Sequence, residues 1–267
     1  MANEAMQRQW NSPEFLKRWR TVEPSAAAAT APLMEVLDPK PGESLLDVGC
    51  GGGLSTLAAA EIVGPTGKLL GADLSEPLLE LARERAREAS AGHVSFIVAD
   101  VQVAQLPGGP FDGAFSRFGV MFFADFVEAF GNIRRHLKPG GRFAFVCFQD
   151  HAANPWYPAA VLAKYAPPRP PSRFPAPSPY ALGDRVRTTG FLDEAGFKRI
   201  EFHPFGGEIE APYDPQASAG QLAPFGLAPD VLAQAQEELR EYEMQFVRDG
   251  ISRTTRQMWA VRAWNDA

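Results

Sequence analysis

Between residues 43 and 148, short apolar runs alternate with longer amphipathic segments. The short runs are rich in Val, Ile, Leu or Phe and are bounded by Gly, Pro or Asp, which is typical of strands; they are residues 43–49, 67–73, 94–100, 111–118 and 141–148. The segments between them predict helices over 54–65, 75–90 and 126–139. Strands that are apolar on both faces and joined by helices indicate a parallel sheet with helices on both sides.

The pattern changes after residue 148. Residues 167–179 hold seven prolines in thirteen positions, which predicts an extended segment, either a lid over the strand ends or a surface loop. Beyond it the pattern predicts a helix at 184–197, a strand at 198–205 and a last strand at 257–264. A long amphipathic helix is expected before the last strand, with an apolar face of Leu232, Ala235, Leu239, Tyr242 and Phe246.

Composition and charge narrow the class of function. The chain has 267 residues, of which 45% are hydrophobic and 22% charged, as expected of a folded protein with a substantial core. A net charge of -6 provides no basic field for a phosphate backbone, so we expect no nucleic-acid partner. With no secretory signal and no apolar run of about 20 residues, a cytoplasmic protein without a membrane span is expected. Cys50 and Cys147 are expected to be buried free thiols.

A glycine-rich turn follows the first predicted strand. Its D-x-G-x-G-x-G pattern is formed by Asp47, Gly49, Gly51 and Gly53. The dinucleotide fingerprint G-x-G-x-x-G does not fit, because its third glycine would fall at Leu54 or Thr56. Glycine at these positions lets the backbone turn tightly and lets a ligand approach it closely.

Two more carboxylates end the second and third predicted strands. Asp73 is suited to accept both hydroxyls of a ribose, as the equivalent acid does in dinucleotide folds. Asp100 is suited to accept a hydrogen bond from the exocyclic amine of adenine, with Val101 offering its backbone N–H. Ligands of parallel α/β sheets bind at the carboxyl ends of the strands, where all these acids lie. Together with the glycine turn, they predict a site for a nucleotide-like ligand.

These motifs, in this order, resemble the class I S-adenosylmethionine-dependent methyltransferases, most closely the small-molecule branch that includes the ubiquinone and menaquinone C-methyltransferases. The matching stretches are LLDVGCGGG, LLGADLSEPLLELARERA, FIVADVQVAQLP, FDGAFSRFGVMFF and HLKPGGRFAFV. The resemblance implies a Rossmann-like, doubly wound seven-stranded sheet with an antiparallel last strand. It also implies S-adenosylmethionine as cofactor and S-adenosylhomocysteine as product.

The resemblance also assigns the expected cofactor contacts. It places the methionine moiety over the turn from Gly49 to Gly53, the ribose on Asp73, and the adenine against Leu74, Asp100 and Val101. We add Asp47 and Ser116, at the ends of the first and fourth strands, to the expected cofactor site.

On this basis the chain divides into four parts. They are an N-terminal helical lid (1–40), the cofactor-binding core (41–150), a helical and Pro-rich cap (151–184) and a C-terminal part (185–267) with a helical insertion at 211–256. Trp10 and Trp19 of the first part are expected to cover the cofactor pocket. No metal is expected, since Asp150 alone is far short of a cation site.

The acceptor side is less defined by sequence. His151 is the preferred candidate base, with a hydrogen-bonding role in its loop as the alternative, and His203 is the second candidate. His136 is expected on the polar face of its helix. Arg117 either binds a carboxylate of the acceptor or cofactor, or pairs with an acid such as Asp47. Candidate walls of an apolar or aromatic acceptor pocket are Phe118, Phe122, Trp156 and Tyr157.

The sequence therefore predicts an enzyme that moves a methyl group by in-line displacement to a small apolar or aromatic acceptor, neutral or anionic. A non-catalytic, regulatory S-adenosylmethionine-binding module is the alternative. A nicotinamide-dependent oxidoreductase is disfavoured by the glycine spacing. Both a monomer and a homodimer are compatible with the sequence.

Overall fold

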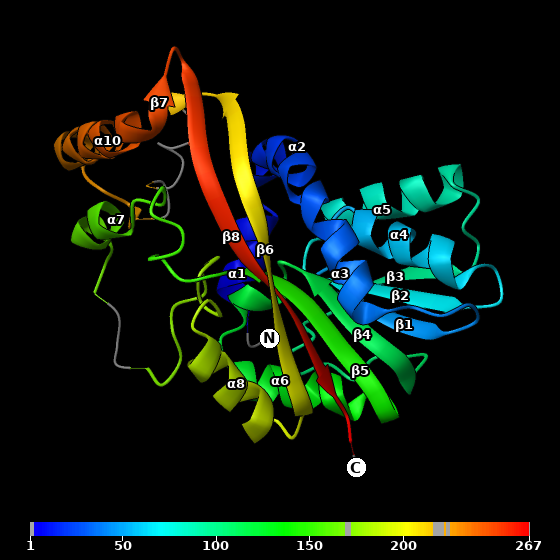
Figure 1. The fold of residues 1–267 in the computed structure, drawn as a ribbon. Helices are drawn as coiled ribbons and strands as arrows, with labels where there is room; N and C mark the ends of the chain where they lie inside the picture. The colour runs from blue at the N-terminus through cyan, green and yellow to red at the C-terminus, as the bar shows by residue number, and fades with distance from the viewer. Residues whose placement is uncertain (1–2, 169–171, 216–221, 223–224, 267) are drawn as a thin grey trace.

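A mixed sheet crosses the centre of the molecule in this computed structural model, which describes residues 3–168, 172–215, 222 and 225–266 (Figure 1). Its strands are β1 (Ser44–Val48), β2 (Lys68–Asp73), β3 (Val94–Val98), β4 (Phe111–Arg117), β5 (Leu137–Phe148), β6 (Lys198–Pro212), β7 (Val247–Arg248) and β8 (Ile251–Trp264). They are ordered β3-β2-β1-β4-β5-β8-β6, with the two-residue β7 paired to β8. The first five strands are parallel, and β8 is antiparallel to both neighbours. The predicted doubly wound sheet is confirmed.

Helices cover both faces of this sheet. They are α1 (Glu4–Trp10), α2 (Pro13–Ala26), α3 (Thr30–Leu37), α4 (Leu54–Val63), α5 (Glu76–Glu88), α6 (Phe126–Arg135), α7 (Ala159–Tyr165), α8 (Arg185–Glu194) and α10 (Pro229–Glu243). Helices α3, α4 and α5 lie on one side, and α6 and α8 on the other (Figure 1). Buried phenylalanines fill the layer under α6, among them Phe130, Phe143 and Phe145. Because both faces are covered, ligands have access only at the strand ends.

The predicted end of the third helix was wrong. The apolar pattern carried the third helix to Pro139, but α6 ends at Arg135 and β5 begins at Leu137. Pairing with the neighbouring strand begins at this point, since Leu137 is in register with Phe111. Leu137 is buried as predicted, but as part of the sheet.

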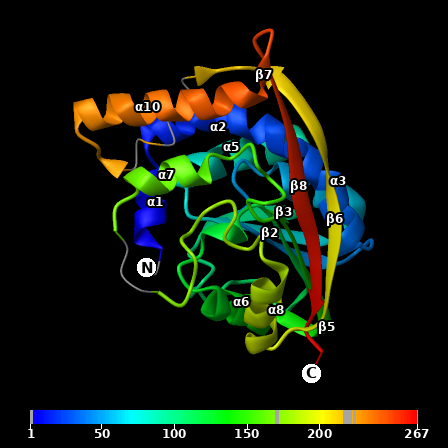
Figure 2. The same ribbon diagram turned by 60° about the vertical axis from the view of Figure 1, so that its left-hand side comes forward.

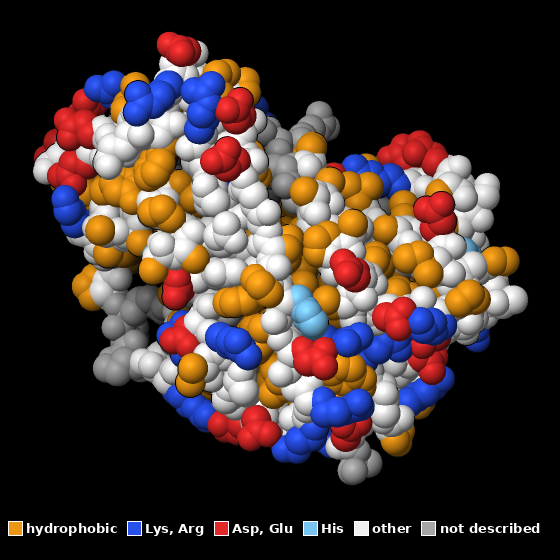
Figure 3. All heavy atoms as spheres, in the orientation of Figure 1, with side chains coloured by type: hydrophobic (Ala, Val, Ile, Leu, Met, Phe, Trp, Pro, Cys, Tyr) orange, Lys and Arg blue, Asp and Glu red, His pale blue; other side chains and the backbone are white. Residues whose placement is uncertain are grey.

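Strands β6 and β8 form a long arm that extends past the rest of the sheet (Figures 1 and 2). Their pairing continues to Pro212 and Ile251, so both ends of the region expected as a helical insertion are strand. The arm carries α10, which ends at Glu243 and packs its buried Ala235 and Leu239 against α7. We call α7, α10 and their contacts the cap lobe; hydrophobic side chains gather on its surface in Figure 3. Of the proline-rich segment, residues 172–179 contain neither helix nor strand, and 169–171 lie outside the described residues.

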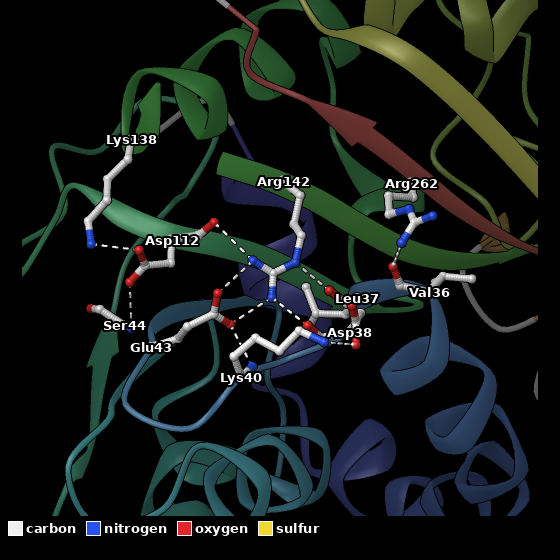
Figure 4. A network of polar contacts seen from close by, with 10 residues as sticks. All are labelled: Val36, Leu37, Asp38, Lys40, Glu43, Ser44, Asp112, Lys138, Arg142 and Arg262. Atoms are coloured by element: carbon white, nitrogen blue, oxygen red, sulfur yellow. Dashed lines mark hydrogen bonds and ion pairs between the residues drawn. The ribbon is translucent and has the colours of Figure 1, made fainter. Parts of the chain in front are cut away.

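A network of charged groups fixes the amino ends of the strands (Figure 4). Arg142 of β5 donates to both carboxylate oxygens of Glu43, at 2.9 and 2.6 Å, and to the carbonyls of Leu37 and Asp38 at the end of α3. Asp112 of β4 accepts from Lys138 at 2.6 Å and from the backbone N–H of Ser44 at 2.9 Å. These bonds join three strands and a helix at the edge opposite the predicted site.

Candidate cofactor and acceptor sites

The glycine turn between β1 and α4 has a backbone that other residues rarely adopt. Gly49 and Gly51 have φ angles of +69° and +52°. A Cβ on Gly49 would lie 2.9 Å from the Cα of Gly119, and one on Gly51 would lie 2.8 Å from the ring of Trp19. The turn is therefore enclosed by the loop after β4 and by the N-terminal helix α2.

Asp47, at the end of β1, is fully buried beneath this turn. Its Oδ2 accepts hydrogen bonds from Ser55 at 2.8 Å and from Thr56 at 2.7 Å, both in the first turn of α4. Burial raises the pKa of Asp47 to about 6. Within the described chain, Asp47 Oδ1 and the indole N–H of Trp19 make no hydrogen bond. One acceptor and one donor near the glycine turn are thus available to a polar ligand.

Asp73, at the end of β2, links the turn to the next helix. Its Oδ2 accepts from the backbone N–H of Gly51 at 2.8 Å, and its Oδ1 from that of Ser75 at 2.9 Å. Burial raises the pKa of this carboxyl, too. Each oxygen retains a second acceptor position, which suits a pair of ribose hydroxyls. Ser75 occupies the N-cap position of α5, but its hydroxyl donates to the carbonyl of Trp10 rather than capping the helix.

Asp100 is bonded to the N-terminus of the chain. The side-chain amide of Asn3 donates to Asp100 Oδ1 at 2.8 Å, and the backbone N–H of Asn3 donates to Oδ2 at 3.0 Å. The side-chain oxygen Oδ1 of Asn3 accepts from the backbone N–H of Ala124 at 3.0 Å. The side-chain amide of Asn3 therefore makes the hydrogen bond to Asp100 that was expected from the exocyclic amine of adenine.

A pocket lies between these carboxylates and the N-terminal helices. It is lined by Asn3, Trp10, Val48, Gly49, Ala72, Asp73, Leu74, Ala99, Asp100, Val101, Gly119, Phe122 and Phe123. Its free volume is about 30 Å³, room for a water molecule or two rather than a nucleoside. The donors and acceptors of the pocket are of the kinds that the adenosine of S-adenosylmethionine requires. In this structure Asn3 and Trp10 occupy the space that the adenosine would need.

Ser116 and Arg117, at the end of β4, point into the protein. The Ser116 hydroxyl is fully buried, donates to the carbonyl of Val48 at 2.6 Å and accepts from the N–H of Gly119 at 3.2 Å. Arg117 donates to the Thr30 hydroxyl at 2.9 Å and forms no ion pair with a described acid. Ser116 joins β1 to the loop after β4, and Arg117 joins the sheet to α3.

Three of the four aromatic residues expected around an acceptor, Phe118, Trp156 and Tyr157, belong to one continuous wall. Phe118 has a φ of +65°, unusual for a large side chain, and its ring stacks on Phe148 at 5.2 Å. Phe148 contacts Trp156 at 6.3 Å between ring centroids. Phe122 packs edge-on against Trp10 at 5.2 Å, on the cofactor side of the same loop. The wall thus begins next to Gly119 and ends in the cap segment.

His151 lies in this aromatic cluster. Its ring stacks on Tyr157 at 5.4 Å and lies 4.4 Å from the ring of Tyr180. Partial burial lowers the pKa of His151 below its ordinary 6.5, so the ring is neutral at pH 7. Its side chain makes no hydrogen bond to a described residue, which leaves its nitrogen free to accept a proton.

Each of the other histidines is within hydrogen-bonding or ion-pairing distance of another group of the protein. The expected polar-face position of His136 was wrong: it is buried, its Nε2 accepts from Leu106 N–H at 2.9 Å, and its Nδ1 donates to the carbonyl of Asn132 at 2.8 Å. His203 is exposed and lies 3.4 Å from Glu201. His93 contacts the carbonyl of Ala60 at 3.2 Å.

Sequence analysis missed four contributors to these sites: Asn3, Thr30, Tyr180 and Arg256. Asn3 and Tyr180 belong to no motif and reach their places only through long-range folding. Arg256 lies just before the last predicted strand, where a pattern of strand residues gives no indication of a site.

Within the described residues, no helix combines the length and apolar character that crossing a membrane requires. The same residues contain no group of three His, Cys, Asp or Glu side chains able to hold a metal ion. Cys50 and Cys147 are buried and free, as predicted.

Comparison with known proteins identifies the family of the chain. Residues 45–141 match a family model described as a methyltransferase domain. Nocamycin O-methyltransferase of Saccharothrix syringae is 32% identical over 60% of this chain, and the match spans 63% of that relative. The ubiquinone/menaquinone biosynthesis C-methyltransferase of Ectopseudomonas mendocina is 30% identical over 67% of this chain and 74% of its own length.

Solved structures resemble the chain over its whole length. Phosphoethanolamine N-methyltransferase 2 of Haemonchus contortus, in complex with S-adenosylmethionine, aligns with a TM-score of 0.64 at 17% identity, covering 100% of this chain and 60% of that one. At this identity the likeness shows a shared fold, and the sequence relatives identify the family. The chain belongs to the class I S-adenosylmethionine-dependent methyltransferases of the small-molecule branch.

Proposed function

We propose that the protein transfers the methyl group of S-adenosylmethionine to a small aromatic acceptor. The observation that carries this proposal is the continuity of the two sites. Gly119 closes on the glycine turn, and the preceding residue, Phe118, begins the aromatic wall through Phe148 to Trp156. An aromatic acceptor lying along this wall would adjoin the methionine end of the cofactor.

The cofactor supplies an electrophilic methyl group on a sulfonium, which an acceptor attacks in line. The chain's own contribution is to hold the two reactants. Asp73 would accept the ribose hydroxyls, Asp47 Oδ1 and the Trp19 indole N–H would be available to the methionine end, and the aromatic wall would orient the acceptor and exclude water. Positioning of this kind lowers a barrier by about 7–11 kcal/mol at its limit, so no nucleophile on the enzyme is needed.

His151 is proposed as the base that removes the acceptor's proton. Its neutral ring stacks on Tyr157 and borders the wall. General-base assistance of this kind contributes about 10²- to 10⁴-fold to a rate. The named activities of the relatives include both O- and C-methyl transfer, and either one requires loss of a proton.

The activity is tested by incubating the protein with S-adenosylmethionine and a panel of phenols, aromatic carboxylic acids and quinols. S-adenosylhomocysteine release is measured, and each product is analysed by mass spectrometry. An acceptor heavier by one methylene, formed together with one S-adenosylhomocysteine, is the expected result. Tight cofactor binding without methylation of any member would favour a non-catalytic, cofactor-binding module instead.

The pH dependence of kcat/KM for the active acceptor tests the role of His151 as a base. Because its pKa is lowered, we expect kcat/KM to rise with pH through a value below 6.5 and to be level at pH 7 and above. His151→Gln should remove this inflection and lower kcat at pH 7.5 by about 10²-fold, with KM for S-adenosylmethionine unchanged. The exposed His203 provides the control, since His203→Gln should preserve the profile. An unchanged profile in His151→Gln would contradict the assignment.

A further inference from the structure

Two polar groups in the acceptor region have no partner within the described chain. Tyr180 is only 5% exposed, and its hydroxyl is buried and makes no hydrogen bond. The Nε of Arg256 is also buried without a partner, and Arg256 forms no ion pair with any described acid. A buried donor without an acceptor destabilises a protein by about 1–3 kcal/mol, so two of them in the same region call for a reason.

Both groups belong to the aromatic wall. The guanidinium carbon of Arg256 lies 5.1 Å from the ring centroid of Trp156. Tyr180 contacts Phe148 at 5.5 Å, Tyr157 at 4.5 Å and His151 at 4.4 Å between ring centroids. The ring of Trp156 also contacts Tyr180, at 6.4 Å between ring centroids, so one indole touches both residues. Tyr180 therefore lies beside the candidate base, and Arg256 lies on Trp156 of the same wall.

The position of Arg256 is fixed by the loop that carries the wall. Asn154 is fully buried, and its side chain both accepts from the N–H of Gln257 at 2.9 Å and donates to the carbonyl of Gln257 at 3.0 Å. The N–H of Gln149 donates to the same carbonyl at 3.0 Å. These bonds attach β8 to the end of β5, so Arg256 lies past the carboxyl end of the parallel strands, where ligands bind in such folds.

The chemistry of the pair defines what it would bind. Arginine keeps its charge in proteins, and burial raises the pKa of Tyr180 so that its hydroxyl remains a donor. Two donors, one of them cationic, require an acceptor oxygen with negative charge. The surrounding rings require that this oxygen be attached to a flat, apolar body.

We propose that Arg256 and Tyr180 bind an anionic oxygen of the methyl acceptor, which makes the preferred acceptor an aromatic carboxylate or phenolate. This inference rests on the proposed methyl transfer and adds the acceptor's class to it. Charged donors make a bound oxygen less nucleophilic, so the pair anchors the acceptor while another atom faces the methyl group. Arg117, the cation that the sequence favoured for this role, is instead engaged with Thr30.

The test is calorimetric titration with two probes of the same shape, anionic 1-hydroxy-2-naphthoate and neutral 1-hydroxy-2-naphthamide. Each is titrated with and without saturating S-adenosylhomocysteine. The wild-type protein should bind the naphthoate at least tenfold more tightly than the amide. Arg256→Gln should abolish this preference and leave the affinity for the amide unchanged, and Tyr180→Phe should reduce it severalfold.

Matched variants separate a local effect from a structural one. Arg253→Gln removes an exposed arginine of the same strand that is paired with Glu210, and should behave as wild type. Arg256→Lys keeps the charge and the aliphatic stem, and should retain part of the preference. Thermal shift by S-adenosylhomocysteine should be equal in all variants, which shows that each is folded.

Three results would overturn the inference: equal binding of both probes by the wild type, an Arg256→Gln variant that keeps the preference, or loss of the preference in Arg117→Gln instead. Because the titrations are also run without the cofactor product, they test Arg256 even if that product does not bind. Failure to bind S-adenosylhomocysteine would count against the proposed methyl transfer alone.

Discussion

Two carboxylates at the strand ends, Asp47 and Asp73, are both buried but are held differently. Asp73 has one backbone N–H on each oxygen, whereas Asp47 has two hydroxyls on one oxygen and nothing from the described chain on the other. Backbone donors fix Asp73 to the glycine turn that it must share with a ligand. The other oxygen of Asp47 has no partner among the described residues. An ionised carboxylate buried in this way destabilises the fold unless it is protonated or finds a partner.

Asp47 should make stability depend on pH in an unusual direction. Its pKa is about 6 in the folded protein against an ordinary 3.8, so the folded state binds more protons between these values. The free energy of unfolding should therefore decrease as pH rises from 4 to 7, with about 3 kcal/mol of the change due to Asp47. Urea unfolding of the wild type and Asp47→Asn at several pH values measures this share. If the free energy of unfolding depended on pH in the same way in both proteins, the contribution assigned to Asp47 would be contradicted.

Sequence reasoning worked best for residues whose role depends on local backbone. The glycine turn and Asp73 follow from strand ends and spacing, and both lie where they were expected. The roles of Arg117 and His136 depend on what packs against them from distant segments, Thr30 and Leu106. No local pattern could indicate those partners.

Among the elements, α1 has a role that its sequence does not show. Through Asn3 it provides Asp100 with two hydrogen bonds in the pocket that suits adenine. Helix α2 instead covers the glycine turn with Trp19. The N-terminal segment therefore places one group, Asn3, on the acid proposed for the nucleoside and another, Trp19, over the glycine turn.

Removing the competing amide should improve cofactor binding. In Asn3→Ala, Asp100 Oδ1 loses the side-chain amide of Asn3 and keeps its backbone donors, and one hydrogen bond to a buried acid is worth about 1 kcal/mol net. Calorimetry should therefore show S-adenosylhomocysteine binding about fivefold more tightly. Trp19→Ala should weaken binding, because the turn loses its cover. Equal or weaker affinity in Asn3→Ala would show that the Asn3 contact does not compete with the cofactor.

Across the whole molecule, the network around Arg142 holds the amino ends of the strands, and the ligand sites occupy the carboxyl ends (Figure 4). The β6–β8 arm extends from this frame and carries the cap lobe beyond the acceptor region (Figure 2). The sheet was predictable because its strands are apolar and regular. The length of the arm was not, because its outer part is polar and exposed and has no buried face to produce a pattern.

The cap lobe should therefore be separable from the core. Leu239 is 1% exposed in the packing of α10 on α7, and Leu239→Ala should destabilise this lobe by about 2–5 kcal/mol. Hydrogen exchange should speed up in α7 and α10 but not in β1 to β5, and binding of S-adenosylhomocysteine should stay within twofold of wild type. Val186→Ala, at an 83% exposed site, is the control. Faster exchange throughout the sheet would mean that the lobe and core unfold together.

The most direct test of the account is calorimetric titration of S-adenosylhomocysteine into the wild type, Asp73→Asn and Asp112→Asn. Asp112 lies at the opposite edge of the sheet, paired with Lys138, and its variant controls for the loss of a charge. We predict one site per chain in the wild type, the same affinity in Asp112→Asn, at least tenfold weaker binding in Asp73→Asn, and no binding of NAD. Equal affinity in all three proteins, or binding of NAD and not S-adenosylhomocysteine, would contradict the assignment of this site.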